Sequence, residues 1–379
     1  MRSREEADQF CQEQVQVIMV INDSILLCAS DIGAARNLAV LAEEARIRNL
    51  PIMIAGSQIS APIFFQAIET PDIRNQKDAV LYLESKKPAI VICGTTRYQS
   101  LDRLLIMAAK QLKIRSMVIL DEWFNYAFRF GKENGGFGYL PDIICCQDQR
   151  AKREAIAEGI PASVLFVTGS IYLTNLMHKA KDFLKSPPPV PDFLNDPAVP
   201  VVTFLSETHG ADYGVAMGEE GPLGKFIGYS QYSVRNDISS ILNKISKPCI
   251  VVEKLHPSDE NTYTPLGSGI VNWVISRQAQ LWPLLWHSDL VIGMRSMALL
   301  EAAILGSSAV SYQPGIIGPE LCTAARFDLI EGIYDKEGLV DWIRGNMGKK
   351  SNREHVSVRK FDFTRDDVLN NIMDLIAQI

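Results

Sequence analysis

The chain has 379 residues, more than a single hydrophobic core usually organises, so two domains are expected. Its composition, 47% hydrophobic and 22% charged, is that of an ordinary globular protein, and its formal net charge of -6 argues against sequence-independent binding to nucleic acid, which needs a surplus of Lys and Arg. The N-terminus is acidic and polar, unlike a signal peptide, and no run of about 18 apolar residues occurs, so a cytoplasmic protein without a transmembrane helix is expected.

The first half of the chain alternates short apolar runs with longer amphipathic ones. The apolar runs predict strands within residues 24–30, 51–57, 87–96, 115–122, 141–148 and 163–170. Helical spacing of apolar residues predicts helices at 33–49, 100–113 and 149–159. Continuous Val, Ile and Leu runs between helices are typical of a parallel sheet covered on both faces. We therefore expect a Rossmann-like N-terminal domain over residues 1–184.

A proline-rich stretch, residues 185–200, interrupts this rhythm and is interpreted as an interdomain linker. The alternation then resumes and predicts a C-terminal Rossmann-like domain over residues 201–379. Thr364 is the expected N-cap of the last helix, which is a candidate to pack back on the N-terminal domain. Two such domains are expected to face each other across a cleft that holds a ligand.

The seven cysteines are odd in number, irregularly spaced and without a C-x-x-C pair. We interpret them as buried, reduced thiols of a cytosolic protein. Cys145 and Cys146 are adjacent in a predicted strand, so their side chains face opposite sides and are poor candidates for a shared metal. No His, Cys and Asp set has metal-ligand spacing, and no metal site is expected.

Two turns of the first half follow predicted strands and could carry chemistry. Gly33, at the start of a helix, would let a ligand approach the backbone, or it simply belongs to a tight strand–helix turn. Asp121 and Glu122 end a strand, where either carboxylate could act as a general base, or they form a solvated acidic turn before a core-packing aromatic helix. Trp123 and Phe124, if exposed, leave a peripheral membrane association open.

In the second half, Lys254 and His256 follow a predicted strand and precede a proline-stiffened turn. The pair could grip a phosphate, with His256 also available as an acid, although a lone His is more often structural. His209, Glu207 and Asp212 lie in a polar loop after the first strand of this domain and are additional candidates.

Residues 289–314 carry the most specific pattern. A strand is predicted from Asp289 to Ile292, a turn with Gly293, Arg295 and Ser296 follows, and a helix then begins with Ser296 as N-cap. Arg295 and the helix N-terminus would bind an anion, and Glu301 could accept hydrogen bonds from a ribose diol. A further strand ends at Gln313, the last candidate ligand-binding residue.

This second-half pattern, which reads DLVIGMRSMALLEAAILGSSAVSYQP, resembles the donor-nucleotide site of the GT-B glycosyltransferase superfamily. The segment VTGSIYLTNL at 167–176 is similar to the end of a GT-B first domain, and KLHP to the His-Pro motif of bacterial sialyltransferases and of capsule and teichoic-acid polymerases. LDEW resembles their paired-acid motif, except that Trp123 replaces the expected Gly.

The resemblance implies a metal-independent enzyme that binds a sugar nucleotide, with no separate cofactor. His256 and Ser296 would contact donor phosphate, Glu301 the ribose, and Asp121 or Glu122 the acceptor hydroxyl. The leading hypothesis is therefore a glycosyltransferase of bacterial surface-glycan or glycoconjugate synthesis. The alternatives are a sugar-nucleotide epimerase or hydrolase on the same fold and a non-catalytic nucleotide-sugar-binding protein. The sugar, base, acceptor, stereochemical outcome and oligomeric state stay open.

Overall fold

The computed structural model describes residues 24–64, 68–96, 100–133, 136–186, 189, 191, 194, 199–349 and 364–378. The chain divides into two compact units, Met1–Leu176 with Asp362–Ile379 and Met177–Phe361. Each unit is an α/β domain with one six-stranded parallel sheet, which confirms the predicted pair of Rossmann-like domains. Most of the proline-rich stretch 185–200 lies outside the described residues. Within the described part of the chain, no helix combines the length and the apolar character needed to cross a membrane.

The sheet of the first unit has the strand order β2-β1-β3-β4-β7-β8, with every neighbouring pair parallel. These strands are β1 (Ile25–Ala29), β2 (Ile52–Gly56), β3 (Ile90–Cys93), β4 (Arg115–Ile119), β7 (Ile143–Cys146) and β8 (Leu165–Val167). The accompanying helices are α2 (Ile32–Ile47), α3 (Gln76–Lys86), α4 (Leu101–Leu112), α5 (Tyr126–Arg129), α6 (Gln149–Ala157) and α14 (Arg365–Ala377), and the boundary between the two units falls within α7 (Ile171–Lys185). Short 3₁₀ turns η1 (Ala61–Ile63) and η2 (Ala162–Val164) and the hairpin β5 (Lys132–Glu133) with β6 (Gly136–Phe137) complete the unit.

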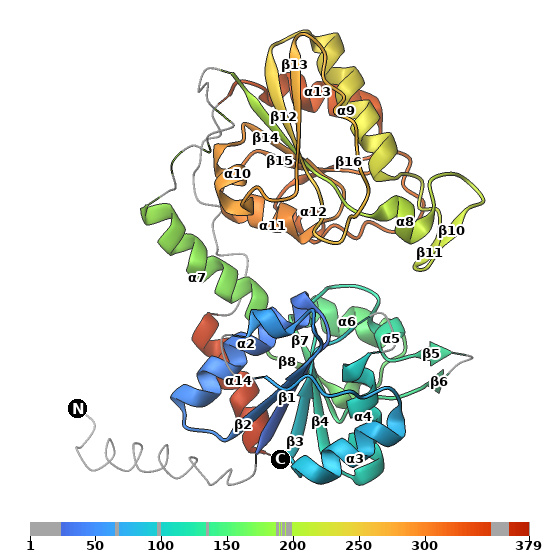
Figure 1. The fold of residues 1–379 in the computed structure, drawn as a ribbon, viewed down its shortest axis with the longest axis vertical. Coiled ribbons are helices and arrows are strands. Elements are labelled where there is room, and N and C mark those ends of the chain that lie inside the picture. Colours follow the sequence, from blue (N-terminus) through green and yellow to red (C-terminus); the bar gives the residue numbers. More distant parts are fainter. Residues whose placement is uncertain are drawn as a thin grey trace. The chain divides into compact units, whose positions relative to one another are not determined.

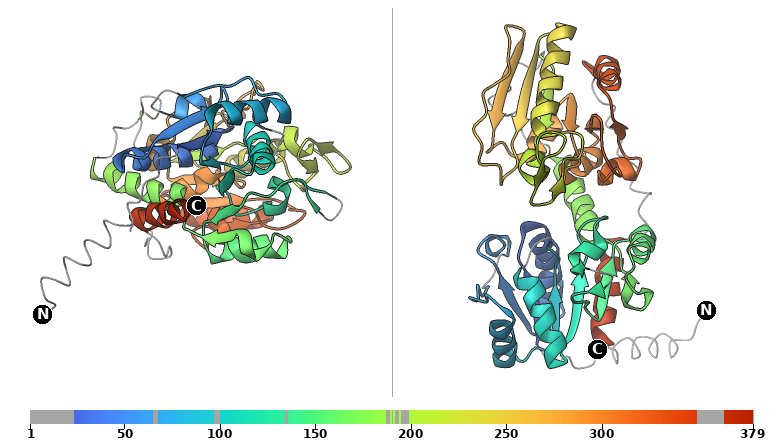
Figure 2. Two further views of the ribbon diagram at one scale, coloured as in Figure 1. Left: turned by 90° about the horizontal axis from the view of Figure 1, so that it is seen from below. Right: turned by 90° about the vertical axis from the view of Figure 1, so that its right-hand side faces the viewer.

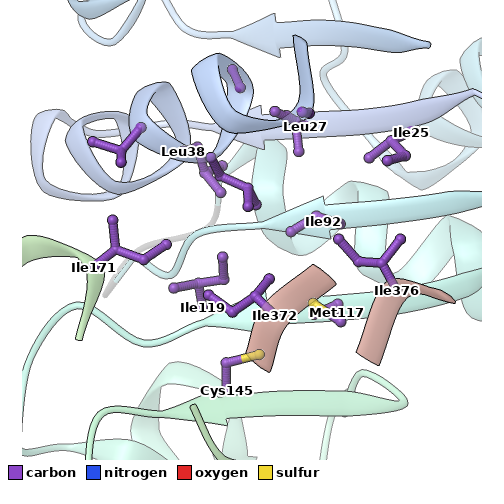
Figure 3. Close-up of a cluster of buried hydrophobic side chains, with 14 of the residues drawn as sticks. Ile25, Leu27, Leu38, Ile92, Met117, Ile119, Cys145, Ile171, Ile372 and Ile376 are labelled. Atoms are coloured by element: carbon purple, nitrogen blue, oxygen red, sulfur yellow. The ribbon is translucent and has the colours of Figure 1, made fainter. Parts of the chain in front are cut away.

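Alternation along the strands divides the first core between two faces. Ile25 and Leu27 of β1 point to the face covered by α2 and α14, where Leu38 and Ile372 join them (Figure 3). The intervening residues of β1 point to the opposite face, on which α4 packs. The last helix, although far away in sequence, is therefore part of the first core. Thr364 caps it through a capping box with Asp367, as the N-cap prediction requires.

The second unit has the strand order β13-β12-β9-β14-β15-β16, again with parallel neighbours. Its strands are β9 (Val201–Leu205), β12 (Cys249–Lys254), β13 (Val271–Ser276), β14 (Leu290–Gly293), β15 (Ala309–Tyr312) and β16 (Glu331–Ile333). Its helices are α8 (His209–Tyr213), α9 (Gln231–Ile245), α10 (Leu281–His287), α11 (Met297–Ile304), α12 (Thr323–Arg326) and α13 (Lys336–Asn346), with a small hairpin of β10 (Glu220–Gly221) and β11 (Gly224–Lys225). Helices cover both faces of each sheet (Figures 1 and 2).

The strand orders locate the edges where ligands of such folds bind. In a doubly wound sheet the binding crevice lies at the carboxyl ends of the strands, where the strand order reverses. In the first unit this reversal falls between β1 and β3, and in the second unit between β9 and β14. The loops that follow these four strands are therefore the first places to look for chemistry.

Candidate active site

The first unit gathers acidic and hydroxyl side chains at the carboxyl edge of its sheet. Asp31 follows β1, Thr95 follows β3, and Asp121 and Glu122 follow β4. Because β1, β3 and β4 are adjacent parallel strands, their carboxyl ends meet at one edge. The structure thus brings the predicted Asp121 and Glu122 to the same carboxyl edge, on the strand next to the reversal point of this sheet.

One buried arginine holds this group together. The Nη1 of Arg129 lies 2.9 Å from Oδ1 of Asp121 and also donates to the hydroxyl of Thr95, and its Nη2 donates to Glu122. The Thr95 hydroxyl in turn donates to Asp121 over 3.1 Å. The side chain of Arg129 is only 2% exposed, against 13% for Asp121 and 26% for Glu122. Arg129 is therefore a buried cation that forms ion pairs with two carboxylates at the carboxyl edge of the sheet.

The carboxyl groups here hold their protons more strongly than usual. Burial raises the pKa of Asp121 to about 7, although Arg129 opposes the shift, and Glu122 and Asp31 add to it by charge repulsion. Burial also raises the pKa of Asp31 and of Asp102, in the first turn of α4, each to about 6. Asp121 can therefore either give or take a proton near neutral pH, which is the property a general acid or base requires.

Gly33 supports this cluster rather than opening a free space. Asp31 caps α2 and accepts from the Ala34 N–H over 2.8 Å, so the helix begins one residue earlier than Gly33. A Cβ at position 33 would lie 2.9 Å from Oδ2 of Asp121. Glycine at this position thus leaves room for the Asp121 carboxylate, which a larger residue would push aside.

The aromatic run after Glu122 is mostly core. Trp123 is 2% exposed, and its Nε1 donates to Asp148 over 2.7 Å. The idea that Trp123 is an exposed aromatic for membrane association is therefore wrong. Tyr126, Phe130 and Tyr139 are buried as well, and they hold the short helix α5 that carries Arg129. The predicted alternative, an acidic turn followed by a core-packing aromatic helix, describes these aromatic residues well.

The second unit has its own buried polar group at its reversal point. Glu207 and His209 follow β9, and Arg295 follows β14. The backbone N–H of Arg295 donates to Glu207 over 2.9 Å, its Nε lies 3.0 Å from Nε2 of His209, and its guanidinium lies 4.7 Å from the centre of the Tyr213 ring. Burial alone would raise the pKa of Glu207, but contacts with His209 and Arg295 hold it below its usual range.

His209 is buried beside Arg295 and Glu207. Its Nε2 lies 3.0 Å from Nε of Arg295 and 3.5 Å from Oε1 of Glu207. His209 is 3% exposed, and within the described residues its Nδ1 has no hydrogen-bond partner. A buried polar atom without a partner is costly, and such atoms are commonly satisfied by a ligand or water.

The start of α11 has the predicted N-cap. The Ser296 side chain caps the helix by accepting from the Ala298 N–H, which confirms the predicted N-cap. Gly306 follows the helix with a φ of 73°, as expected of a helix C-terminus. Gly293 has a packing role: a Cβ there would lie 3.1 Å from Leu299, so glycine lets α11 sit close to β14.

Two other predicted ligand residues already bond to protein groups. Glu301 is 8% exposed, and its Oε2 accepts from the indole N–H of Trp282. Gln313 is 1% exposed; its amide nitrogen donates to Ser311 over 2.7 Å and to Glu320 over 2.5 Å, and its oxygen accepts from Tyr229. Both hydrogens of that amide are used, so Gln313 fixes the loop after β15.

The Lys-x-His pair lies at the end of β12. Lys254 donates to the carbonyl of Arg277 over 2.6 Å, and burial lowers its pKa. His256 is exposed, and its Nδ1 lies 2.6 Å from the Ser258 hydroxyl. The structure therefore places both residues on the carboxyl edge of the second sheet, on the strand next to β9.

The whole chain is similar to solved two-domain structures. It superposes on the UDP-GlcNAc 2-epimerase of Methanocaldococcus jannaschii in complex with UDP-GlcNAc and UDP, with a TM-score of 0.60, 12% identity, and coverage of 94% of this chain and 100% of the other. For the UDP-GlcNAc 2-epimerase of Neisseria meningitidis bound to UDP-GlcNAc, the TM-score is 0.60 at 15% identity, with 94% and 100% covered. For Acinetobacter baumannii MurG it is 0.52 at 11% identity, with 94% and 100% covered. No protein-family model and no curated protein matches the sequence.

These likenesses define the fold, which is GT-B-like. They also correct the leading interpretation of the sequence. Several of the similar structures are UDP-GlcNAc 2-epimerases, including one from Rickettsia bellii with a TM-score of 0.62. They favour the epimerase alternative over a glycosyltransferase, and they do not show a His-Pro sialyltransferase type. A shared fold hosts several reactions, and the sequence pattern common to them could not separate a transferase from an epimerase.

Proposed function

We propose that this chain is an enzyme that acts on a nucleotide sugar without a second sugar acceptor, as an epimerase or hydrolase of a UDP-N-acetylhexosamine-type substrate. The observation that carries the proposal is Asp121, a carboxyl group at the carboxyl edge of the first sheet whose pKa is raised to about 7. Inverting a C–H centre requires a group that removes a proton and a group that returns one. Hydrolysis requires a group that activates water.

The second unit would hold the nucleotide diphosphate. Arg295 supplies a permanent positive charge, and the α11 N-terminus, capped by Ser296, adds the positive end of a helix dipole. Nδ1 of His209, which has no hydrogen-bond partner among the described residues, is a further polar atom that a bound ligand could contact. Glu301, whose carboxylate accepts from Trp282, is proposed to accept also from the ribose hydroxyls. The UDP-sugar ligands of the similar epimerase structures support this assignment.

The first unit would supply the proton transfer. Asp121 would exchange the proton with the substrate. Arg129 holds the carboxylates of Asp121 and Glu122 in position. Thr95 donates to the same carboxylate and so fixes its orientation. Holding a protonatable group in one geometry is a large part of what an acid–base catalyst needs.

The reaction itself is tested by incubating the full chain with UDP-GlcNAc in heavy water, with no sugar acceptor. An epimerase breaks and remakes a C–H bond, so the sugar should gain solvent deuterium at the inverted carbon and a second sugar nucleotide should accumulate. A hydrolase should instead release nucleoside diphosphate and free sugar. Nuclear magnetic resonance of the mixture reads both outcomes. If the sugar nucleotide binds but is returned unlabelled and intact, the chain is a binding protein and the proposal is wrong.

Replacing Arg295 with Ala is expected to weaken binding of UDP and UDP-GlcNAc by about tenfold to a hundredfold, because a charge-assisted contact to phosphate contributes about 1.5–3 kcal/mol. Isothermal titration calorimetry measures the affinity. The control is Arg277→Ala, which removes an exposed arginine of the same unit whose described hydrogen bond is to the carbonyl of Asn261. Equal affinity of the Arg295 and Arg277 variants would remove Arg295 from the phosphate site.

A further inference from the structure

Three side chains with metal-ligating atoms meet inside the first unit, between the sheet and α4. Cys28 of β1 and Cys93 of β3 lie directly opposite each other in the parallel register, and Asp102 lies in the first turn of α4. Their ligand atoms all lie within 4.8 Å of one another. All three residues are at most 1% exposed. The proposed proton transfer by Asp121 uses none of them.

The fold places these groups together although the sequence separates them. Leu27 and Ile92 point to the α2 face of the sheet, so the next residues along β1 and β3, Cys28 and Cys93, point to the opposite face. Helix α4 packs on that face against both strands. Sequence spacing alone could not reveal the set, because its members are contributed by two strands and a helix.

The geometry points to a site for a thiophilic divalent cation of the zinc class, ligated by Cys28, Cys93 and Asp102. Sγ of Cys28 lies 3.4 Å from Oδ1 of Asp102. A tetrahedral zinc ion with ordinary Zn–S and Zn–O distances places a sulfur and an oxygen ligand roughly 3.5 Å apart. Two sulfur ligands favour zinc-like ions over magnesium or calcium, which prefer oxygen. A fourth position is left for water or for the Ser30 hydroxyl, which accepts from the Asp102 N–H.

Neighbouring backbone groups can stabilise the negative charge that these ligands carry when they bind a cation. Oδ2 of Asp102 accepts from the Ser30 N–H over 3.2 Å, and Asp102 lies at the positive end of the α4 dipole. Burial raises the pKa of both thiols and of Asp102. Cysteine ligates a metal as the thiolate, so uptake of a cation by this cluster would displace thiol protons. The competing arrangement is a protonated cluster in which the Cys28 thiol bonds Asp102 and takes up no metal.

The test is metal uptake by the full chain. Protein reduced and stripped with a chelator is loaded with Co²⁺, freed of excess ion, and examined for metal content and for thiolate-to-cobalt charge-transfer absorption. About one tightly bound ion per chain is expected, with Zn²⁺ displacing it. Cys28→Ser and Cys93→Ser should each weaken the affinity by at least about tenfold. Cys145→Ser is the matched control, because it removes a buried thiol of the same sheet that lies outside the cluster.

A wild-type protein with no thiolate–cobalt band would overturn the inference, as would equal metal content in the Cys28, Cys93 and Cys145 variants. Asp102→Asn covers the case in which a cysteine variant does not fold, because it leaves both thiols in place. It should retain the sulfur–cobalt band with weaker affinity, and an unchanged affinity would exclude Asp102 as a ligand. Metal content is read without substrate, so the result does not depend on the proposed nucleotide-sugar activity.

Discussion

Replacing Arg129 with Met should lower the free energy of unfolding of the first unit by about 3 kcal/mol at pH 8. Removing one partner of a buried ion pair leaves the other charge buried and uncompensated, and such changes cost roughly 3–5 kcal/mol. We take the lower end because Asp121 and Glu122 are 13% and 26% exposed, so water screens part of the loss. Urea titration measures the free energy of unfolding. Faster hydrogen exchange in peptides that contain β3 and β4 would assign the loss to this unit.

Two comparisons sharpen this result. Arg74→Met removes an exposed arginine that bonds Asp72 in the same unit, and it should leave the free energy of unfolding unchanged. In the Arg129 variant the loss should shrink at pH 5, because Asp121, with a pKa of about 7, is then largely protonated and no longer needs the cation. An equal loss at both pH values would show that Arg129 contributes packing rather than charge compensation.

The architecture was largely predictable from the sequence because each strand is a short, continuous apolar run. Runs such as residues 24–30 and 289–294 are too apolar for a sheet with one wet face, and the amphipathic segments between them require helices on both faces. Caps such as Ser296 and Thr364 were readable for the same reason: they depend on residues three or fewer positions away.

The candidate site was only partly predictable, because its partners come from distant segments. Asp121 was visible as a carboxylate at a strand end, but Arg129 was hidden in an aromatic run that reads as core. An arginine in such a run is itself a signal, since a buried guanidinium needs acidic partners. Exposure was also misjudged at Trp123, whose indole N–H finds Asp148 only in the folded chain.

The same limit explains why the reaction was misassigned. The Gly293-to-Gln313 segment describes how the second unit could hold a nucleotide, which transferases and epimerases share. The distinguishing chemistry depends on which groups can move protons. The ability of a group to move protons follows from the burial and the charges around Asp121, Asp31 and Glu122. Neither quantity can be predicted from the neighbouring sequence.

Asp121→Asn is expected to make the protein more stable above pH 7 and to lower its turnover by about a hundredfold or more. The pKa of Asp121 rises from an ordinary value of 3.8 to about 7 on folding. Between these pH values the folded protein holds a proton that the unfolded chain has lost, so the free energy of unfolding falls as pH rises. The groups that face this carboxyl are Arg129 of α5, Glu122 beside it and Asp31 before α2. The contribution of Asp121 to the free energy of unfolding is therefore largest at low pH, decreases as the pH rises to about 7, and no longer changes above that pH.

An amide in place of the carboxyl cannot ionise, and its oxygen can still accept from Arg129 and Thr95. The variant should be more stable than the wild type at pH 8 by on the order of 2 kcal/mol, half of what the full shift would give. Its slope of stability against pH between 4 and 7 should be smaller. Turnover of the sugar nucleotide should fall by about a hundredfold or more with little change in binding affinity, because the proton-transfer group is lost while the phosphate site is intact.

The control variant is Asp182→Asn, on an exposed part of α7. It makes the same chemical change and should alter neither the stability nor the turnover. If Asp121→Asn kept both the wild-type pH slope and its turnover, Asp121 would be neither the titrating group nor the catalyst. A variant that gained stability but kept its activity would separate the two roles and move the proton transfer to Glu122 or Asp31, which share the same arginine and the same edge of the sheet.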